Sequence, residues 1–327
     1  MPEVPAIDPG DLTAAVDQGF PLRTAEKVWR LLQLLRKFQA RPDSRGKFTL
    51  KGGTALNIFH RPEIPRLSVD IDLMATGFPG AAPRTPHRRR AIRSVEAACR
   101  ELRYHVTSAS LDGGAGMSFS CEYRDQLGTP DRIKVDLDLL NRMTFIAPVS
   151  ERGPGLFAAE DLEFPLVDEA ELFGQKLTAV AWRARPRDLY DMCTMLRGEW
   201  DRRPRARSLY LAYSFLNNTE WNRLAYPVRL QVLYPVEQLG DVLRVSERPP
   251  SLEEIRRLAH QRLEGVIPSF TAATAEEEAL RGQLLRGERE AFGRIAGEED
   301  PTRCRTLANH PGLLWRLRQA SRPPRPP

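Results

Sequence analysis

The sequence predicts an α+β fold, with a mixed sheet in the first half of the chain and mainly helices in the second half. The first half contains short segments that alternate apolar and polar residues, which is the period-two pattern of strands. From Glu169 onward, apolar residues recur at helical spacing instead. The chain has 327 residues, which is enough for a core domain followed by a helical domain.

Changes of composition and pattern divide the chain into four segments. Residues 1–22 are rich in proline and predict a flexible arm, and residues 23–165 carry the strand and helix patterns of a core. Residues 166–320 predict a mainly helical C-terminal domain, and the proline-rich residues 321–327 predict a disordered tail.

The elements of the core follow from local patterns. Apolar residues at helical spacing predict a helix over residues 24–38, with Thr24 as its N-cap. A strand at 48–50 leads into the turn Gly52-Gly53 and a short helix over 54–60. The remaining predicted core elements are a strand at 66–74, a basic helix over 88–103, and strands at 104–110, 117–123 and 132–140.

Composition excludes several classes of protein. No apolar run reaches the roughly 18 to 20 residues that a membrane helix needs, so no membrane association is expected. The first residues show neither the basic nor the apolar region of a secretory signal, which predicts a cytoplasmic protein. The four cysteines form no CxxC pair, so neither a zinc site nor a disulfide framework is expected. The net charge of +6 favours a polyanionic partner.

Two carboxylates, Asp70 and Asp72, lie two residues apart in the predicted strand at 66–74. Because successive side chains of a strand point to opposite faces, these carboxylates share one face while Ile71 and Leu73 share the other. Same-face positions lie about 6.6 Å apart, which lets both carboxylates bind the metal ions of phosphoryl-transfer chemistry. The pattern therefore predicts a Mg²⁺ site, with Mn²⁺ as the alternative ion.

A third carboxylate from a neighbouring strand would complete such a metal site. In the predicted strand at 132–140, Asp136 and Asp138 alternate with the apolar residues Val135 and Leu137. Asp136 is the first candidate for the third ligand. Asp138 shares its face and stays an alternative.

The turn formed by Lys51, Gly52, Gly53 and Thr54 predicts a nucleotide-binding segment. Glycine has no Cβ, so its backbone can approach phosphate oxygens, and the N–H groups that open the following helix can donate to them. Thr54 either adds a hydroxyl donor or caps the helix, and Ser68 lies on the carboxylate face within reach of a phosphate. A phosphate-binding turn beside paired carboxylates predicts a nucleotidyltransferase that uses a nucleoside triphosphate (NTP).

Three ordered motifs carry a family resemblance. They are LKGGTAL at residues 50–56, RLSVDIDL at 66–73 and ARPRDLYDM at 184–192, with HPGLLWRL at 310–317 as a C-terminal signature. Together they resemble the AbiEii/AbiGii nucleotidyltransferase toxins, a group that includes the mycobacterial MenT toxins. The resemblance implies a DNA polymerase β-like nucleotidyltransferase core followed by a helical C-terminal domain.

The resemblance also assigns roles to residues of this sequence. It implies that Asp70 and Asp72 bind metal and that Lys176 contacts the nucleotide phosphates. Asp188 matches the aspartate of the last motif and is implied as a catalytic residue, with Asp191 as the second acidic candidate.

The function implied by the resemblance is that of a toxin with a cognate antitoxin protein. Such a toxin transfers NMP from an NTP to RNA, with the 3′ acceptor end of tRNA as the expected target, and so inhibits translation. Two alternatives stay open. One is nucleotidyl transfer to a hydroxyl of a protein or small molecule such as an antibiotic, and the other is a non-catalytic module that binds nucleic acid or a partner.

Overall fold

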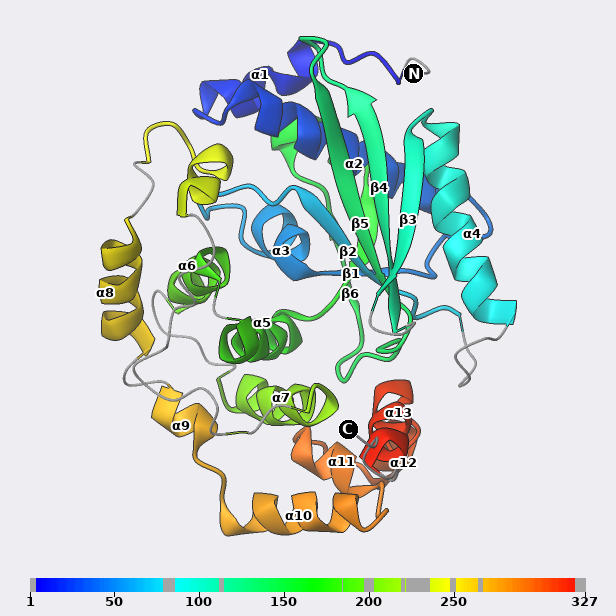
Figure 1. Cartoon of the computed structure of the whole chain (residues 1–327), viewed down its shortest axis with the longest axis vertical. Helices are drawn as coiled ribbons and strands as arrows, with labels where there is room; N and C mark the ends of the chain where they lie inside the picture. The colour runs from blue at the N-terminus through cyan, green and yellow to red at the C-terminus, as the bar shows by residue number, and fades with distance from the viewer. Residues whose placement is uncertain are drawn as a thin grey trace, which may run out of the picture. The chain divides into compact units, whose positions relative to one another are not determined.

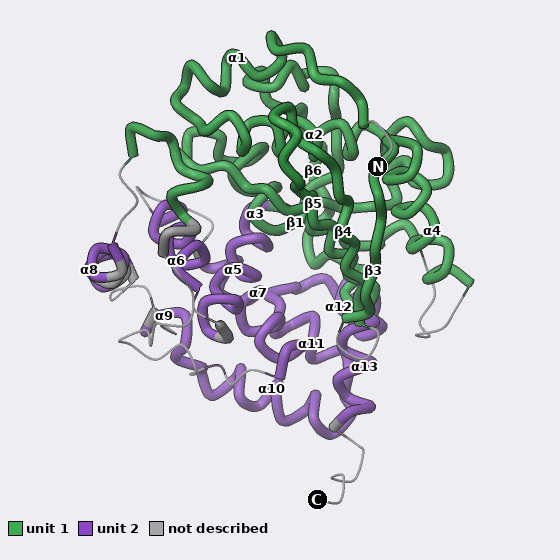
Figure 2. Tube along the Cα trace, turned by 45° about the horizontal axis from the view of Figure 1, so that its top comes forward, with its two compact units in different colours: residues 1–168, 237–249 green, residues 169–236, 250–327 purple. Residues whose placement is uncertain are grey.

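The computed structural model describes residues 4–78, 86–111, 115–183, 185–196, 203–218, 221, 236–247, 251–263 and 267–320. The chain forms two compact units (Figure 2). Unit 1 comprises residues 1–168 and 237–249, and unit 2 comprises residues 169–236 and 250–327. Within the described residues, no helix has both the length and the apolar character that crossing a bilayer requires.

Unit 1 contains a mixed sheet, which its described residues form from seven strands in the order β3-β4-β5-β2-β1-β7-β6. Strand β2 pairs in parallel with β5 and antiparallel with β1. Side chains at the ends of these three neighbouring strands, and in the loops that follow them, can therefore lie close together. The strands are β1 (Thr49–Lys51), β2 (Asp70–Met74), β3 (His105–Leu111), β4 (Gly116–Arg124), β5 (Pro130–Asp138), β6 (Val149–Arg152) and β7 (Glu163–Leu166).

Two helices, α2 (Leu22–Ala40) and α4 (Pro86–Glu101), cover one face of this sheet (Figure 1). Alternate residues of the strands, such as Phe119 and Val135, are fully buried on that face. The intervening residues of β4 and β5 are polar and exposed or half-buried, so they line the opposite face, which we call the open face. The period-two pattern of the sequence thus separates core side chains from those of the open face.

The expected flexible arm over residues 1–22 is wrong for much of its length. Helix α1 (Gly10–Asp17) forms there, and α2 begins at Leu22. Leu12, Ala15 and Phe20 are almost completely buried, which supplies the apolar contacts that hold this proline-rich stretch in place.

Two further differences concern the edge of the sheet and the boundary between the units. Strands β6 and β7 were not predicted, because each has only four residues and β7 includes Pro165. Residues 237–249 return to unit 1, although the sequence placed them in the helical domain. The N–H of Leu67 donates to the Val242 carbonyl at 2.9 Å, and Arg66 forms an isolated antiparallel bridge with Leu243.

The described part of unit 2 is helical, which confirms the predicted fold class. The helical pattern over residues 273–297 forms two helices, and that over 306–319 belongs to two others because Pro311 starts a new helix. The predicted tail 321–327 lies outside the described residues. The α-helices are α5 (Glu169–Arg183), α6 (Pro186–Met195), α7 (Arg203–Leu216), α8 (Leu252–Leu263), α9 (Ile267–Thr271), α10 (Ala275–Leu285), α11 (Ala291–Ile295), α12 (Pro301–Leu307) and α13 (Pro311–Ala320).

Candidate functional site

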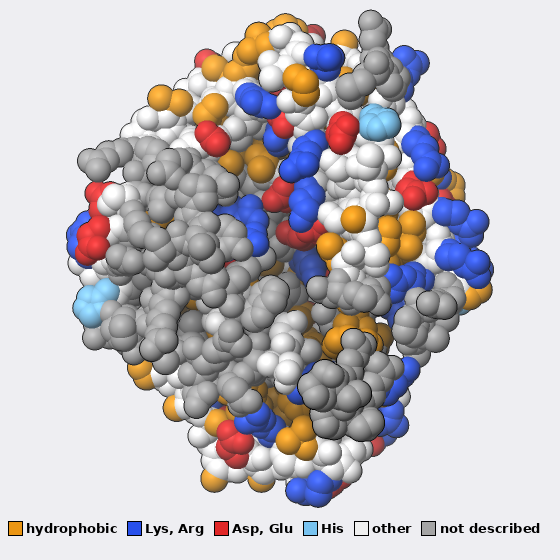
Figure 3. All heavy atoms as spheres, viewed as in Figure 1, with side chains coloured by type: hydrophobic (Ala, Val, Ile, Leu, Met, Phe, Trp, Pro, Cys, Tyr) orange, Lys and Arg blue, Asp and Glu red, His pale blue; other side chains and the backbone are white. Residues whose placement is uncertain are grey.

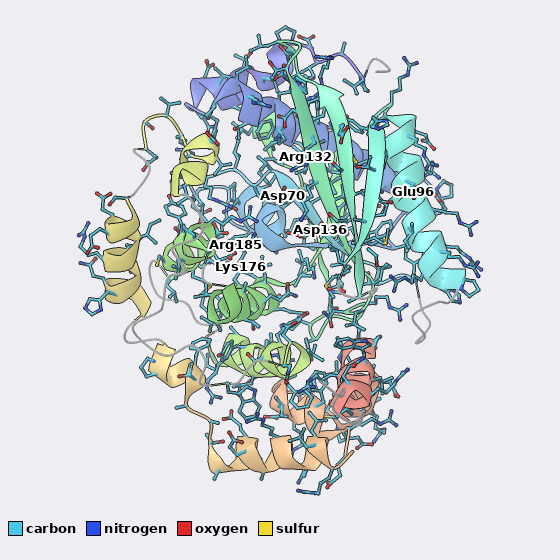
Figure 4. The ribbon with its side chains drawn as sticks, in the orientation of Figure 1. Asp70, Glu96, Arg132, Asp136, Lys176 and Arg185 are labelled. Carbon is cyan, nitrogen blue, oxygen red and sulfur yellow. The ribbon has the colours of Figure 1, made fainter. Side chains whose placement is uncertain are left out.

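The predicted carboxylate pair lies on the open face of the sheet. Ile71 and Leu73 are fully buried on the opposite face of β2, so Asp70 and Asp72 point away from the core. In the parallel register with β5, Asp70 lies opposite Lys134 and Asp72 lies opposite Asp136. Figure 4 labels Asp70 and Asp136 over this part of the sheet.

The two candidates for the third carboxylate differ in their surroundings. Asp138 accepts a hydrogen bond from Lys51 Nζ at 2.7 Å and from the backbone N–H groups of Leu140 at 3.0 Å and Asn141 at 2.8 Å. Burial raises the pKa of Asp138, but Lys51 and these donors outweigh it and lower the pKa below its usual value. Asp138 is thus committed to local structure, which leaves Asp136 as the better candidate.

Lys51 was predicted to bind nucleotide, and the structure pairs it with a carboxylate. Burial alone lowers the pKa of Lys51, but attraction to Asp138, Asp72 and Asp136 outweighs burial and raises it. The ammonium group therefore stays charged among the carboxylates. Its hydrogen bond with Asp138 ties β1 to the end of β5.

Both carboxylate oxygens of Asp136 have hydrogen-bond donors. Ser118 Oγ on β4 donates to Oδ1 at 2.6 Å, and Lys134 Nζ donates to Oδ2 at 2.5 Å. Among the residues that the structure describes, no group of three His, Cys, Asp or Glu side chains is arranged to hold a metal ion. The donor chemistry of Asp70 and Asp72 fits a hard divalent cation, whereas Asp136 would first have to release at least one of its present donors.

The glycine turn lies directly against the acidic strand. Helix α3 (Gly52–Thr54) starts at the end of β1 and continues as the π-helix η1 (Ala55–His60). Gly52 has a φ of +74°, and a Cβ at this position would overlap the Asp72 carboxylate. A Cβ on Gly53 would lie 2.6 Å from Ser68 Oγ. Both glycines are therefore required for contact with the carboxylate strand, whatever the turn binds.

The predicted alternatives for Thr54 were a phosphate contact or a helix cap. Its side chain is fully buried, and its hydroxyl donates to the backbone carbonyl of Asp70. The N-cap position is occupied by Lys51. The structure therefore gives Thr54 a third role, in which it holds the start of β2 against the glycine turn.

Unit 2 contains the predicted lysine and the acidic residues of the RDLYD motif. Lys176 on α5 donates to Asp191 Oδ2 on α6 at 2.7 Å. The Lys176 side chain is 10% exposed and that of Asp191 is fully buried. Asp188 lies one turn earlier on α6 and is also buried. The sequence ranked Asp188 first, and the structure shows that Asp191 forms an ion pair with Lys176.

Two side chains beside the carboxylates were missed by the sequence analysis, namely Lys134 and Ser118. Lys134 shares the face of Asp136 in the alternating segment, so the period-two pattern could have identified it. Ser118 reaches Asp136 only through the register of β4 with β5, which the sequence does not reveal. Figure 3 shows acidic and basic side chains side by side over this part of unit 1.

Two clusters of arginines, one on α7 and one on α4, differ in their contacts. Arg205 lies 3.7 Å from Glu298, and Arg207 Nη2 donates to Glu277 Oε2 at 2.8 Å, so both arginines tie helices of unit 2 together. On α4 of unit 1, Arg89, Arg90 and Arg93 are exposed. The α4 cluster is thus the better candidate for contact with a polyanion.

Comparisons with known proteins identify the family. The family model described as "Nucleotidyl transferase AbiEii toxin, Type IV TA system" matches residues 33–282. No curated protein matches this chain significantly. Among solved structures, the chain is similar to MenT4, a nucleotidyltransferase toxin from Mycobacterium tuberculosis H37Rv, with a TM-score of 0.55 and 17% sequence identity. That match covers 88% of this chain and 100% of MenT4, and it supports the fold.

The family match covers well over half of the chain, and it includes the glycine turn, the paired carboxylates of β2 and the Lys176–Asp191 pair. The protein therefore belongs to the AbiEii nucleotidyl transferase toxin family of type IV toxin–antitoxin systems, and it is a nucleotidyltransferase.

Proposed function

We propose that this toxin transfers NMP from an NTP to the 3′ acceptor end of tRNA in the cytoplasm and so inhibits translation. The observation that carries the proposal is the open face of the sheet, where Asp70 and Asp72 point outward and Asp136 lies opposite Asp72. On this face Asp70 and Asp72 are half-buried beside the glycine turn, an arrangement that suits a substrate with phosphate groups. A cognate antitoxin is the expected protein partner of a type IV toxin.

Asp70 and Asp72 would hold the divalent metal, Mg²⁺ or Mn²⁺, with Asp136 as the third ligand. When bound, the metal would neutralise charge on the triphosphate and favour ionisation of the acceptor hydroxyl. The backbone N–H groups of Gly52 and Gly53 open a helix and would donate to phosphate oxygens.

Lys176 would contact the triphosphate, because its ammonium is a compact cation that balances phosphate charge. Its hydrogen bond with Asp191 fixes the position of the ammonium on α5. We therefore propose Asp191 as the positioning residue for Lys176. Asp188 stays the alternative acidic residue for contact with the acceptor hydroxyl.

RNA would be bound by its backbone phosphates, and the exposed arginines of α4, which lies on the other face of the sheet from the paired carboxylates, would contact the body of a folded RNA and not its 3′ end. Folded tRNA can be recognised by its shape and by its single-stranded 3′ end. Neither kind of recognition requires extensive base-specific contacts. Binding should then weaken steeply as salt concentration rises.

The test is an acceptor assay with the purified full-length chain. Each of the four NTPs, labelled at the α-phosphate, is incubated with Mg²⁺ and total RNA, a protein extract or small hydroxyl compounds. We expect the label in RNA of tRNA size, at the 3′ end. Label that appears in protein or in a small molecule, with none in RNA, would overturn the RNA proposal.

Two variants accompany the assay. Asp70→Asn removes one charge from the open face and should abolish labelling without unfolding the chain. Asp161→Asn is the matched control, because this exposed carboxylate pairs with Arg36 at 2.5 Å on another part of unit 1. Labelling by Asp161→Asn should equal that of the wild type.

A further inference from the structure

The open face carries a cation for which the proposed reaction has no role so far. Lys134 lies on β5 directly opposite Asp70, and its Nζ lies 2.5 Å from Asp136 Oδ2. It therefore contacts the proposed third metal ligand while it faces one of the other two. A positive charge in this position competes with a metal ion for Asp136.

The neighbouring pair of Lys51 and Asp138 shows what a fixed ion pair looks like in this sheet. Lys51 is 23% exposed and Asp138 is 16% exposed, and two backbone N–H groups also donate to Asp138. Lys134, in contrast, is 48% exposed and Asp136 is 28% exposed. An exposed lysine on a flexible stem can change partner at little energetic cost.

From this contrast we infer that Lys134 is a substrate-binding residue that exchanges partners during nucleotide binding. In the protein without nucleotide, Lys134 neutralises Asp136 and holds its carboxylate in place. When NTP and metal bind, Lys134 releases Asp136 to the metal and donates to an oxygen of the triphosphate instead. The inference rests on the proposed metal role of Asp70, Asp72 and Asp136.

The exchange keeps the charge on the open face balanced in both states. Without ligand, the positive charge of Lys134 offsets the negative charge of Asp136, one of the three carboxylates proposed to bind metal. With ligand, the metal offsets the carboxylates, and the ammonium offsets negative charge on the triphosphate. Ser118, which donates to the other oxygen of Asp136 at 2.6 Å, keeps that carboxylate oriented during the exchange.

The inference predicts opposite effects on metal and nucleotide when the charge of Lys134 is removed. In Lys134→Met, Mn²⁺ should bind the free full-length protein more tightly, by about five-fold, because a competing charge is gone. An NTP analogue that resists transfer should bind about ten-fold more weakly in the presence of Mn²⁺. The Mn²⁺ measurement uses the electron paramagnetic resonance signal of unbound Mn²⁺, and calorimetry gives the affinity for the analogue.

Two companions make the test specific. Lys134→Arg keeps the charge and should bind both ligands within about three-fold of the wild type. Lys37→Met removes a surface lysine of α2 that pairs with Glu101 at 3.3 Å, and it should change neither affinity. Circular dichroism spectra confirm that each variant is folded.

The inference is overturned if Lys134→Met binds Mn²⁺ as the wild type does, or more weakly. It is equally overturned if the variant binds the NTP analogue as tightly as Lys37→Met does. Neither measurement includes an acceptor, so their outcome is independent of the labelling assay. A toxin that labels protein instead of tRNA would contradict the proposed acceptor and leave the role of Lys134 intact.

Discussion

The open face of unit 1 and the α5–α6 pair of unit 2 both place a lysine beside an aspartate, but they differ in burial. Lys134 is 48% exposed beside Asp136, whereas Lys176 is 10% exposed beside the fully buried Asp191. Breaking a buried ion pair leaves a charge without compensation, and breaking an exposed pair costs little. Burial therefore separates ion pairs that are fixed from those that can change partners at little cost.

The largest expected effect tests the chemistry of the open face itself. Asp72→Asn should lower nucleotidyl transfer by about 1000-fold or more, because the side chain loses its charge at the proposed metal site. The initial rate of label transfer measures this loss. Wild-type activity in folded Asp72→Asn would remove Asp72 from the list of metal ligands.

The next largest effect tests the buried pair of unit 2. Lys176→Met should lower the free energy of unfolding by about 3 kcal/mol, because the fully buried Asp191 would lose its ion pair with Lys176. Urea denaturation followed by circular dichroism measures the change. The double variant Lys176→Met with Asp191→Leu should recover most of the loss, and a double variant as unstable as the single one would contradict this account.

Gly52 of the glycine turn can be compared with Gly128, which lies between β4 and β5 and has a similar backbone φ angle. Gly52 has a φ of +74° and Gly128 a φ of +76°, but only at Gly52 would a Cβ meet another residue, the Asp72 carboxylate. We expect Gly128→Ala to cost about 1 kcal/mol of stability from backbone strain, and Gly52→Ala about 3 kcal/mol. Equal losses in urea denaturation would show that contact with Asp72 is unimportant.

The pair of Lys51 and Asp138 predicts a dependence of stability on pH. The pKa of Asp138 is lowered on folding, so its contribution is present above its unfolded pKa of about 3.9 and is lost as pH falls through the folded value. The pKa of Lys51 is raised, so its contribution is present below its unfolded pKa of about 10.4 and is lost as pH rises through the folded value.

Asp138→Asn is the variant that checks this dependence. At pH 7 it should be less stable than the wild type by about 1 kcal/mol, and the difference should shrink as the pH falls below about 4. Urea titrations of both proteins at a series of pH values measure the difference. A difference that stays constant into strong acid would contradict the lowered pKa.

The smallest expected effect completes the comparison between exposed and buried pairs. Lys134→Met should change the free energy of unfolding by less than about 0.5 kcal/mol, because its pair with Asp136 is half-exposed and screened by solvent. The same urea titration applies. A loss as large as that of Lys176→Met would mean that Lys134 is fixed, and would argue against an exchange of partners.

Much of the fold could be predicted because its strands alternate with a clear period. The alternation of apolar Ile71 and Leu73 with Asp70 and Asp72 predicted the strand. It also predicted the face of the sheet on which the two carboxylates lie. The same pattern located Asp136 on β5. These predictions depend only on residues close in sequence, which is why they succeeded.

The contacts of the site depend on residues far apart in sequence, and local patterns do not contain them. The hydrogen bond from Lys51 to Asp138 joins residues 87 positions apart and requires the order β5-β2-β1. The choice between Asp188 and Asp191 depends on how α6 packs on α5. The burial of Leu12 and Ala15 could likewise not be predicted, because they lie in a proline-rich stretch whose burial depends on tertiary contacts.

The return of residues 237–249 to unit 1 has a consequence for synthesis of the toxin on the ribosome. Unit 1 draws on chain from before and after the first part of unit 2, and Leu67 depends on Val242 for a backbone hydrogen bond. Unit 1 therefore lacks the contacts of residues 237–247 until that segment has left the ribosome. A stop codon placed earlier would therefore release an unfinished unit 1 instead of a shorter working enzyme.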